Sequence, residues 1–440
     1  MKATLTLFLV GVFLSSIGFS FYYRIGLGVD ASAYDRIGWN LARGFGYIEN
    51  EAYRASPLHD DAIIRVGPGY EFFIAGLYSV FGHHREVVWI FHALLRVCTA
   101  LFIALTVTAL FGENRFAEKF GFIAALLFAL NPDLLTINGM LLAETLLIAI
   151  LSVCLYASVR VLRDASMHNV FIAGFFWALA TLVRPTMILP TLVIGIMCAW
   201  KGRFRSMLLF FSLPILFVGG WSLRNSLLYH QPLFTTTAGS FALWVGNNPD
   251  ATGGYDKPEY IQQERDAHHS VELSKISTKK YFEFVTQNPY QFIKLQMRKT
   301  AMYFSLIRPS GFWLHLKEKP VDRVISLVLS ELYTVPLMII GVAGLYLYVR
   351  RRAHYAWFLC ALAIVQPLVV IPTYVETRYR YPAYLFLSLF AAYFLVERLG
   401  KRERIFAVMV SSLFFLSMTA IDLSYSWGLV LERLHFLKII

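Results

Sequence analysis

The sequence predicts an all-α protein that crosses a membrane many times. Of its 440 residues, 57% are hydrophobic and only 15% are charged, whereas a soluble domain carries about 25% charged residues. The charged residues also gather in short loops between long apolar runs. An apolar run of about 20 residues can span a bilayer as a helix. We therefore expect a bundle of eleven transmembrane helices and two longer loop regions that carry interfacial helices.

Eleven segments are poor in charged residues, and each is expected to form one spanning helix. The first is longer than the core of about 7–15 residues that a secretory signal has, which favours an uncleaved span over a cleaved leader. The four cysteines all lie inside hydrophobic runs, so no disulfide framework is expected. The expected spans are 3–23, 87–111, 118–131, 141–160, 169–183, 186–200, 206–223, 326–349, 354–371, 381–396 and 405–425.

The loop charges predict the orientation of the bundle. Fourteen Lys and Arg residues lie in the short loops on one side, and only Arg184, Arg378 and Arg380 lie in those on the other. Because basic loops stay in the cytoplasm, we expect a multi-pass protein of the plasma (inner) membrane with a cytoplasmic N-terminus. The formal net charge of +12 follows from this bias, so membrane lipids are expected as partners and nucleic acid is not.

Two long segments, 24–86 and 224–325, fall on the extracytoplasmic side of this arrangement. The first contains the apolar stretch 68–82, which is too short to span the bilayer and indicates a re-entrant or interfacial helix. The second contains a charged stretch, 256–300, which is rich in Lys and Glu and is expected to be helical. Neither loop has the composition of an independent domain, so residues 1–440 are expected to form one transmembrane domain.

The fifth and sixth expected spans form a short hairpin. Each has about 15 residues, which at 1.5 Å per residue covers only about 22 Å of a ~30 Å bilayer core. The joining sequence VRPT places Arg184 below the outer surface. An arginine at that depth needs a partner or a water-filled cavity. The hairpin therefore predicts a cavity that opens to the outside at membrane depth.

Seven short motifs follow one another along nearly the whole chain. The first, DASAYDRIGWNLARGFGY at 30–47, resembles the first-loop motif of membrane glycosyltransferases of the GT-C class, in particular the protein-mannosyltransferase-like and aminoarabinose-transferase-like enzymes, and the other motifs occur in matching order. Each motif alone is weak, and their order and spacing carry the resemblance. The others are RVGPGYEFFIAGLYSVFG at 65–82, AETLL at 143–147, LVRPTMILP at 182–190, WSLRNSLL at 221–228, WVGNNPDATGGY at 244–255 and RYRYPAY at 378–384.

The resemblance implies a GT-C-like fold and a specific reaction. A sugar carried on a polyprenyl phosphate (undecaprenyl or dolichyl) would pass to a lipid, glycan or protein acceptor on the extracytoplasmic side, with inversion at the anomeric carbon. The family's first-loop aspartate matches Asp30, which is expected to be the general base that takes a proton from the acceptor hydroxyl. Arg65 matches a basic position of the family and is expected to bind the donor phosphate. Arginine suits phosphate because of its permanent charge and forked donors.

Each of these residues also has a structural interpretation. Asp30 could only cap the helix that follows it, and Arg65 could reach toward lipid headgroups. Further phosphate candidates are Arg184, Arg378 and Arg380, which could instead pair with carboxylates such as Asp30, Glu144 and Glu376. Because Arg378 and Arg380 alternate along the chain, only one of the two is expected to face the cavity.

A second group of residues is expected to line the site. Tyr34 shares a helix face with Asp30, and Arg96 is an ionisable residue inside a span. His83 and His84 could bind a divalent metal only with a third ligand that the sequence does not place, so no cofactor is assigned. The full group is Tyr34, Arg96, Glu144, Arg224, His83 and His84.

Two other function classes fit the same composition. A transporter or flippase of lipid-linked saccharides would also need cations for phosphate, but transporters often have duplicated halves, and this sequence shows no internal repeat. A saccharide polymerase or ligase would also have many spans, but would lack the aspartate-bearing first loop.

Overall fold

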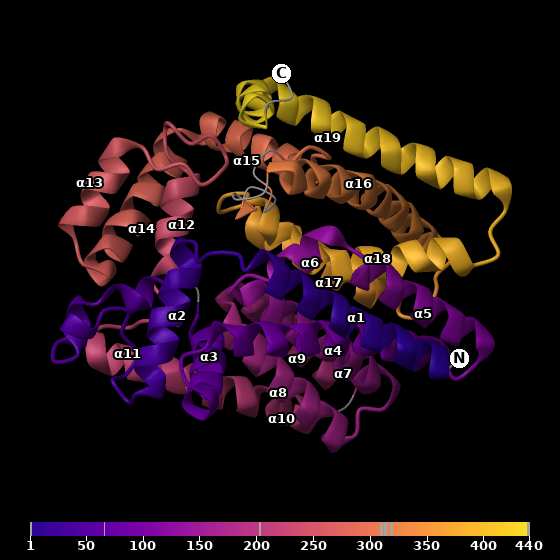
Figure 1. Cartoon of the computed structure of the whole chain (residues 1–440), viewed down its shortest axis with the longest axis horizontal. Coiled ribbons are helices and arrows are strands. Elements are labelled where there is room, and N and C mark those ends of the chain that lie inside the picture. The colour runs from indigo at the N-terminus through magenta and orange to yellow at the C-terminus, as the bar shows by residue number, and fades with distance from the viewer. Residues whose placement is uncertain are drawn as a thin grey trace.

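The computed structural model describes residues 2–65, 67–201, 204–308, 311, 315–316 and 320–437. The regular elements of these residues are all helices, which confirms the all-α prediction. Long helices run side by side in a bundle, and shorter helices gather at the end of the bundle opposite the N-terminus (Figure 1). The polypeptide therefore has a layered arrangement, with a body of long apolar helices and a cap of shorter, more polar ones.

The bundle is built from both halves of the chain. Among the described residues, six helical segments, one of which runs from α10 through α11, have the length and apolar composition needed to cross a membrane, or seven if the bent pair α5 and α6 counts as one span. Shorter apolar helices, among them α8 and α17, lie between them. The bundle helices are α1 (Lys2–Tyr23), α4 (Arg85–Phe111), α5 (Arg115–Ala129), α6 (Pro132–Asn138), α7 (Ala143–Arg163), α8 (Met167–Val183), α9 (Ile188–Lys201), α10 (Phe204–Pro214), α11 (Gly220–Tyr229), α16 (Pro320–Arg350), α17 (Ala356–Val370), α18 (Tyr381–Val396) and α19 (Lys401–Phe436).

Every predicted span overlaps one of these helices, but the count of eleven is not confirmed. The difference has a physical origin. α8 has 17 residues and α9 has 14, and a helix of that length covers only part of a ~30 Å core. An apolar run in a sequence therefore identifies a buried helix without fixing whether it crosses the whole bilayer.

The cap comes from the two predicted loop regions. The first supplies α2 (Val29–Ala42) and α3 (Pro68–Phe81), which pack against each other. The second supplies α12 (Ala238–Gly246), α13 (Glu259–Ala267), α14 (Ser270–Gln287) and α15 (Pro289–Phe304). The charged stretch 256–300 is therefore helical, as its sequence predicts.

Two helices of the C-terminal half of the chain pack very closely. α16 and α18 approach so closely that a Cβ atom at Gly344 would lie 2.0 Å from the carbonyl oxygen of Phe390. Small residues at such crossings let two membrane helices share a large van der Waals contact. A larger side chain at this position would push the helices apart.

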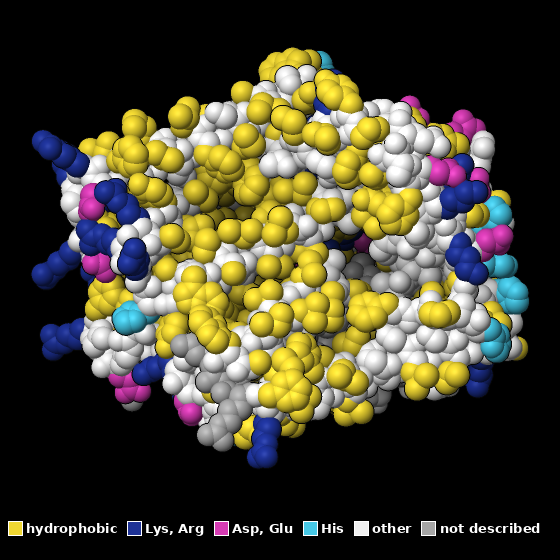
Figure 2. All heavy atoms as spheres, turned by 180° about the vertical axis from the view of Figure 1, so that it is seen from behind, with side chains coloured by type: hydrophobic (Ala, Val, Ile, Leu, Met, Phe, Trp, Pro, Cys, Tyr) yellow, Lys and Arg dark blue, Asp and Glu magenta, His cyan; other side chains and the backbone are white. Residues whose placement is uncertain are grey.

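Charge is distributed along the bundle axis. Figure 2 shows Lys and Arg side chains projecting from the end where α1 begins, a broad apolar surface in the middle, and a mixture of acidic, basic and His side chains at the other end. An apolar belt between two polar ends is the surface expected for a multi-pass membrane protein. The excess of cations at one end agrees with the loop-charge pattern of the sequence.

Candidate active site

Asp30 lies in the first turn of α2, and its side chain does not cap that helix. The N-cap residue is Gly28, with no side-chain cap hydrogen bond. The Asp30 carboxylate instead faces two arginines, with its Oδ2 atom 2.8 Å from Nη1 of Arg378 and its Oδ1 atom 3.9 Å from Nη1 of Arg65. The side chain is 31% exposed, so it remains accessible from the adjoining cavity. The capping interpretation of Asp30 is therefore wrong.

Arginines reach this site from three distant parts of the chain. Arg378 lies in the short helical turn Thr377–Arg380 before α18, and its Nε atom is 2.7 Å from Glu376 and 3.8 Å from Glu144. Arg184, in the α8–α9 connection, lies 3.7 Å from Glu144, and its guanidinium stacks 4.5 Å from the Tyr379 ring. The half-buried Arg184 thus has the carboxylate partner that an arginine within a membrane bundle needs.

A carboxylate that sequence reasoning missed holds Arg65. Oε2 of Glu49 accepts hydrogen bonds from Nε and Nη2 of Arg65 at 2.9 and 2.6 Å. Arg65 thus stands between Glu49 and Asp30. Glu49 lies in an irregular part of the first loop, where no local pattern indicates its partner.

The arginines determine the charge state of Asp30. Burial raises the pKa of its carboxyl group, but the attraction of Arg378, followed by that of Arg65 and Arg184, outweighs burial and leaves the pKa below its usual value. Asp30 is therefore ionised at neutral pH. An ionised carboxylate can accept a proton, but it is a weak base while arginines hold it.

A cavity of about 720 Å³ adjoins Asp30, and we call it the Asp30 cavity. Among the described residues that line it, seven carry Lys or Arg side chains and four carry carboxylates, so the cavity favours an anionic ligand. The hydrophobic side chains of Met140, Leu142 and Met302 complete part of the wall. Its cations are Arg65, Lys257, Arg265, Arg298, Arg308, Arg378 and Arg380.

Lys257 and Arg265 are site candidates that sequence reasoning missed. Both come from the segment around α13, within the stretch that reads as an ordinary charged surface helix. Burial and the neighbouring Arg265 lower the pKa of Lys257, whereas Asp266 and Asp30 raise it. The mutual repulsion of two cations is relieved when an anion binds between them. The basic residues just after the GNNPDATGG turn were the available signal in the sequence.

Of the other predicted site residues, some lie next to Asp30 and some lie elsewhere in the structure. Tyr34 lies beside Glu144, Arg184 and Arg378 in a small pocket next to Asp30. Arg380 also lines the cavity, but its guanidinium donates to the carbonyl oxygens of Ser305 (2.7 Å) and Met302 (2.6 Å). Both arginines therefore line the cavity, so the expectation that only one would face it is wrong, and Arg378 is the member of the pair that meets carboxylates.

Four of the residues that were expected to line the site lie elsewhere. Arg96 donates to Ser16 at 3.0 Å and to a carbonyl of α5, between the helices of the bundle. Arg224 lines a separate apolar groove beside Trp221. His83 lines another cavity, described below, and the His84 side chain lies near Gly82. The structure does not bring these four residues to Asp30.

The described residues do not form a metal site. No group of three or more His, Cys, Asp and Glu side chains is placed among them to hold an ion. The carboxylates nearest Asp30 are already paired with arginines, which repel a divalent cation. We assign no metal ligand.

A family model supports the resemblance that the motifs indicate. Residues 65–219 match the family described as dolichyl-phosphate-mannose-protein mannosyltransferase. The chain is similar to GT-C membrane glycosyltransferases. The matched segment includes Arg65, Glu144 and Arg184, whereas Asp30 and Arg378 lie outside it.

Solved structures give a related result. Two crystal structures of ArnT from Cupriavidus metallidurans, one bound to undecaprenyl phosphate and one in the apo state, match over 100% of this chain and 75% of theirs. The first has 13% sequence identity and a TM-score of 0.49, and the second has 16% and 0.48. No curated protein matches the sequence significantly.

Proposed function

We propose that this protein transfers a sugar from a polyprenyl-phosphate donor, undecaprenyl or dolichyl, to an acceptor on the extracytoplasmic side of the membrane. The observation that carries the proposal is the pairing of Asp30 with Arg378 at the wall of a cation-rich cavity. A lipid phosphate needs cations, and an acceptor hydroxyl needs a base. The Asp30 cavity brings both within one site.

The same arginines connect donor binding to the strength of the base. A donor phosphate in the Asp30 cavity competes with Asp30 for Arg378 and Arg65. As these arginines turn to the phosphate, the pKa of Asp30 rises and its carboxylate becomes a better proton acceptor. The bound donor thereby prepares the residue that activates the acceptor.

In the proposed step, the acceptor oxygen attacks the anomeric carbon from the face opposite the phosphate. The C–O bond to phosphate breaks, the hydroxyl proton passes to Asp30, and polyprenyl phosphate leaves with the electron pair. Arg378, Arg65 and the cations of the 257–265 segment stabilise the charge that develops on the leaving phosphate. The product has the inverted configuration, because the displacement occurs in one step.

The release of free polyprenyl phosphate tests this proposal against a transporter or flippase. Purified protein in lipid nanodiscs would be given a panel of undecaprenyl-phosphate-linked sugars and a crude envelope extract as the source of acceptor. A transferase releases free undecaprenyl phosphate from one of the lipid-linked sugars, and Arg378→Leu should abolish that release. Movement of an intact lipid-linked sugar across vesicles, without release of the carrier, would favour the transporter. Mass spectrometry of copurified lipid would identify the carrier.

A further inference from the structure

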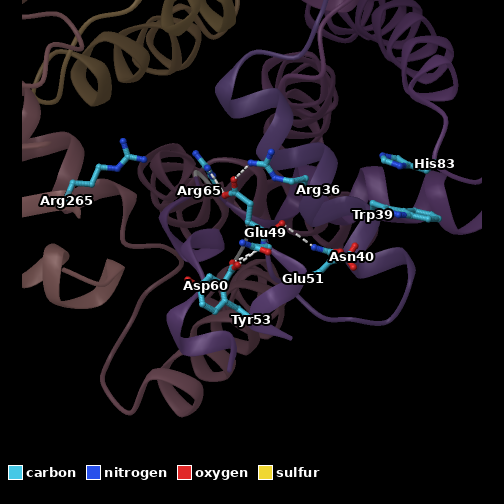
Figure 3. A pocket seen from close by; sticks show the side chains of 11 residues that line it. Arg36, Trp39, Asn40, Glu49, Glu51, Tyr53, Asp60, Arg65, His83 and Arg265 are labelled. Atoms are coloured by element: carbon cyan, nitrogen blue, oxygen red, sulfur yellow. Dashed lines mark hydrogen bonds and ion pairs between the residues drawn. The ribbon is translucent and has the colours of Figure 1, made fainter. Parts of the chain in front are cut away.

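A second cavity lies next to the first, between α2, the 49–60 segment and α13. It has a volume of about 800 Å³, within the range of sites for small polar ligands. Trp39 and His83 form one side, and Arg265 reaches across from the other (Figure 3). We call it the Trp39 cavity. Of the residues that the sequence marked as site candidates, Arg65 and His83 line it.

The lining of the Trp39 cavity is polar and electrically balanced. Every side chain that lines it, within the described part of the chain, carries a hydrogen-bonding group, so it differs from a site for a lipid tail. The Asp30 cavity has an excess of cations, whereas here three arginines face three carboxylates. The charged lining residues are Arg36, Arg65, Arg265, Glu49, Glu51 and Asp60. This balance favours a neutral ligand with many hydroxyl groups over a phosphate or another ion.

The walls of the cavity are held rigidly before any ligand binds. Asp60 accepts hydrogen bonds from the backbone N–H groups of Glu49 (2.7 Å), Asn50 (2.8 Å) and Ala62 (2.8 Å), which fixes one side. Such a carboxylate cannot leave its place without exposing three unpaired donors. A preformed polar wall reduces the ordering cost of binding.

The opposite wall is an aromatic pair anchored by a buried acid. The rings of Trp39 and His83 stack with centroids 4.9 Å apart and an interplanar angle of 7°. Nε2 of His83 lies 3.1 Å from Asp35, which also accepts a 2.5 Å hydrogen bond from the hydroxyl of Tyr78. Aromatic walls with a few fixed polar groups are typical of sites that bind a small molecule in one orientation.

The two cavities meet at the arginines. Arg65 and Arg265 line both of them, and Glu49 pairs with both Arg36 and Arg65. Arg65 is in turn 3.9 Å from Asp30. A ligand in the Trp39 cavity can therefore extend one hydroxyl past Arg65 toward Asp30, while the Asp30 cavity holds a phosphate.

We propose that the Trp39 cavity binds the acceptor as a neutral saccharide, free or attached to a lipid. This assignment rests on the proposed transferase function and specifies the substrate class for it. The balanced charge excludes anionic glycans from the preferred ligands, and the polar lining places the sugar, rather than any attached lipid chain, in the cavity.

Binding to immobilised glycans tests the assignment. The probe is an array of neutral glycans ending in glucose, galactose, mannose or N-acetylglucosamine, beside glycans ending in uronic or sialic acid. The wild type should bind neutral members, and Trp39→Ala and Tyr53→Ala should weaken that binding about tenfold or more. Trp427→Ala and Tyr290→Ala, which change exposed aromatic residues outside the cavity, are the matched controls. Melting temperatures identify any variant that fails to fold. Tyr53→Ala is the variant least expected to disturb folding, because Tyr53 lies at the surface.

A second readout follows the transferred sugar. In reactions with a glycan that binds, Trp39→Ala should reduce transfer of the donor sugar to the glycan and increase its transfer to water. Water can act as acceptor without occupying the Trp39 cavity. Competition by the same glycan, free in solution or linked to a lipid, distinguishes a soluble acceptor from a glycolipid. If only the linked form competes, the acceptor is a glycolipid whose sugar occupies the cavity.

Three results would overturn the assignment: no neutral glycan binds the wild type, acidic glycans bind better, or both cavity variants bind as the wild type does. These outcomes are separable from failure of the transferase proposal. Release of polyprenyl phosphate with glycan binding unaffected by either variant rejects the acceptor site alone. Glycan binding that depends on Trp39, without any release of polyprenyl phosphate, rejects the transferase alone.

Discussion

Asp30 forms ion pairs with arginines that come from distant parts of the chain. In the absence of donor, Arg378 neutralises Asp30 at 2.8 Å and Glu376 at 2.7 Å, so no carboxylate is left as an uncompensated charge in a partly dehydrated cavity. A phosphate that enters can take over these donors. In the proposed reaction, Arg378 therefore pairs first with Asp30 and then with the donor phosphate.

Asparagine at position 30 separates the chemical role of the carboxylate from its shape. Asp30→Asn keeps the size of the side chain but removes the proton acceptor, so sugar transfer should fall about 10²–10⁴-fold. Donor affinity should be equal to or higher than that of the wild type, because asparagine at this position does not compete with the phosphate for Arg378 and Arg65, and the melting temperature should stay near wild type. Asp256→Asn, which changes another carboxylate of the same cavity, should cost much less. Single-turnover transfer measures the effect, and normal transfer by Asp30→Asn would remove Asp30 from the chemistry.

Glu71 predicts a pH dependence of stability. This carboxyl group of α3 is fully buried, with a 3.1 Å hydrogen bond from Tyr47, and burial raises its pKa to about 8 from 4.5. The folded protein thus binds more protons than the unfolded chain between these values, and stability is lost as pH rises through 8. The melting temperature, measured in detergent from pH 5 to 9, should fall more steeply with pH for the wild type than for Glu71→Gln.

The matched control for that experiment is Glu272→Gln, since Glu272 is an exposed carboxylate of α14. The melting temperature of Glu272→Gln should change with pH in the same way as that of the wild type. Equal slopes for the wild type and Glu71→Gln would mean that Glu71 is ionised in the folded protein at neutral pH.

At the scale of elements, the end of α12 fixes the segment that carries Arg378. Asn247, just after α12, donates to the carbonyl oxygen of Pro372 at 2.9 Å and accepts a 2.7 Å hydrogen bond from the buried Lys299. Burial lowers the pKa of Lys299 to about 7. The backbone N–H of Val375 adds a 2.9 Å bond to Gly253. These hydrogen bonds therefore tie the loop of the cap to the segment before α18.

Gly246 is where this contact is tightest. A Cβ atom there would lie 1.9 Å from the carbonyl oxygen of Thr373, so Gly246→Ala must displace the 372–375 segment. We expect a loss of about 1–3 kcal/mol of stability and reduced donor affinity, because Arg378 shifts with the segment. Gly239→Ala, in the same helix with open space around it, should be nearly neutral. Melting temperature and donor titration of the two variants check this, and equal behaviour would show that the segment yields freely.

At the scale of the whole molecule, the charge distribution assigns the two ends of the bundle to the two sides of the membrane. The end where α1 begins carries the excess of cations, and the cap with the Asp30 cavity lies at the other end. The positive-inside rule then predicts that the cap lies outside the cytoplasm. That side is also where a lipid-linked sugar would meet an envelope acceptor.

Cysteine labelling of intact cells tests this placement. Tyr290→Cys, at an 80% exposed position of the cap, should react with an impermeant maleimide from outside. Glu113→Cys, in the exposed connection between α4 and α5, should react only after the membrane is opened. The protein with its four native cysteines is the control for background labelling. Labelling of Glu113→Cys alone in intact cells would invert the topology and with it the proposed side of the reaction.

The helices could be predicted from the amino-acid sequence, because apolar length, helical period and loop charge are properties of neighbouring residues. The sequence also identified Asp30, Arg65, Arg184 and Arg378 as a group through ordered motifs, although their catalytic roles remain predictions. It left undecided whether Asp30 caps α2, because a capping carboxylate and a reactive one have the same local pattern.

The pairing of the charges could not be predicted in this way, because it depends on how the helices pack. Asp30 and Arg378 are brought together by the packing of the cap on the bundle, and no periodicity connects positions so far apart in the chain. The same holds for Glu49 with Arg65 and for the approach of Arg265 to the two cavities. Ion pairs depend on side-chain separations of a few ångströms, and those separations are fixed by helix crossings rather than by sequence order. The partners of each charge, and the Trp39 cavity itself, therefore belong to the fold.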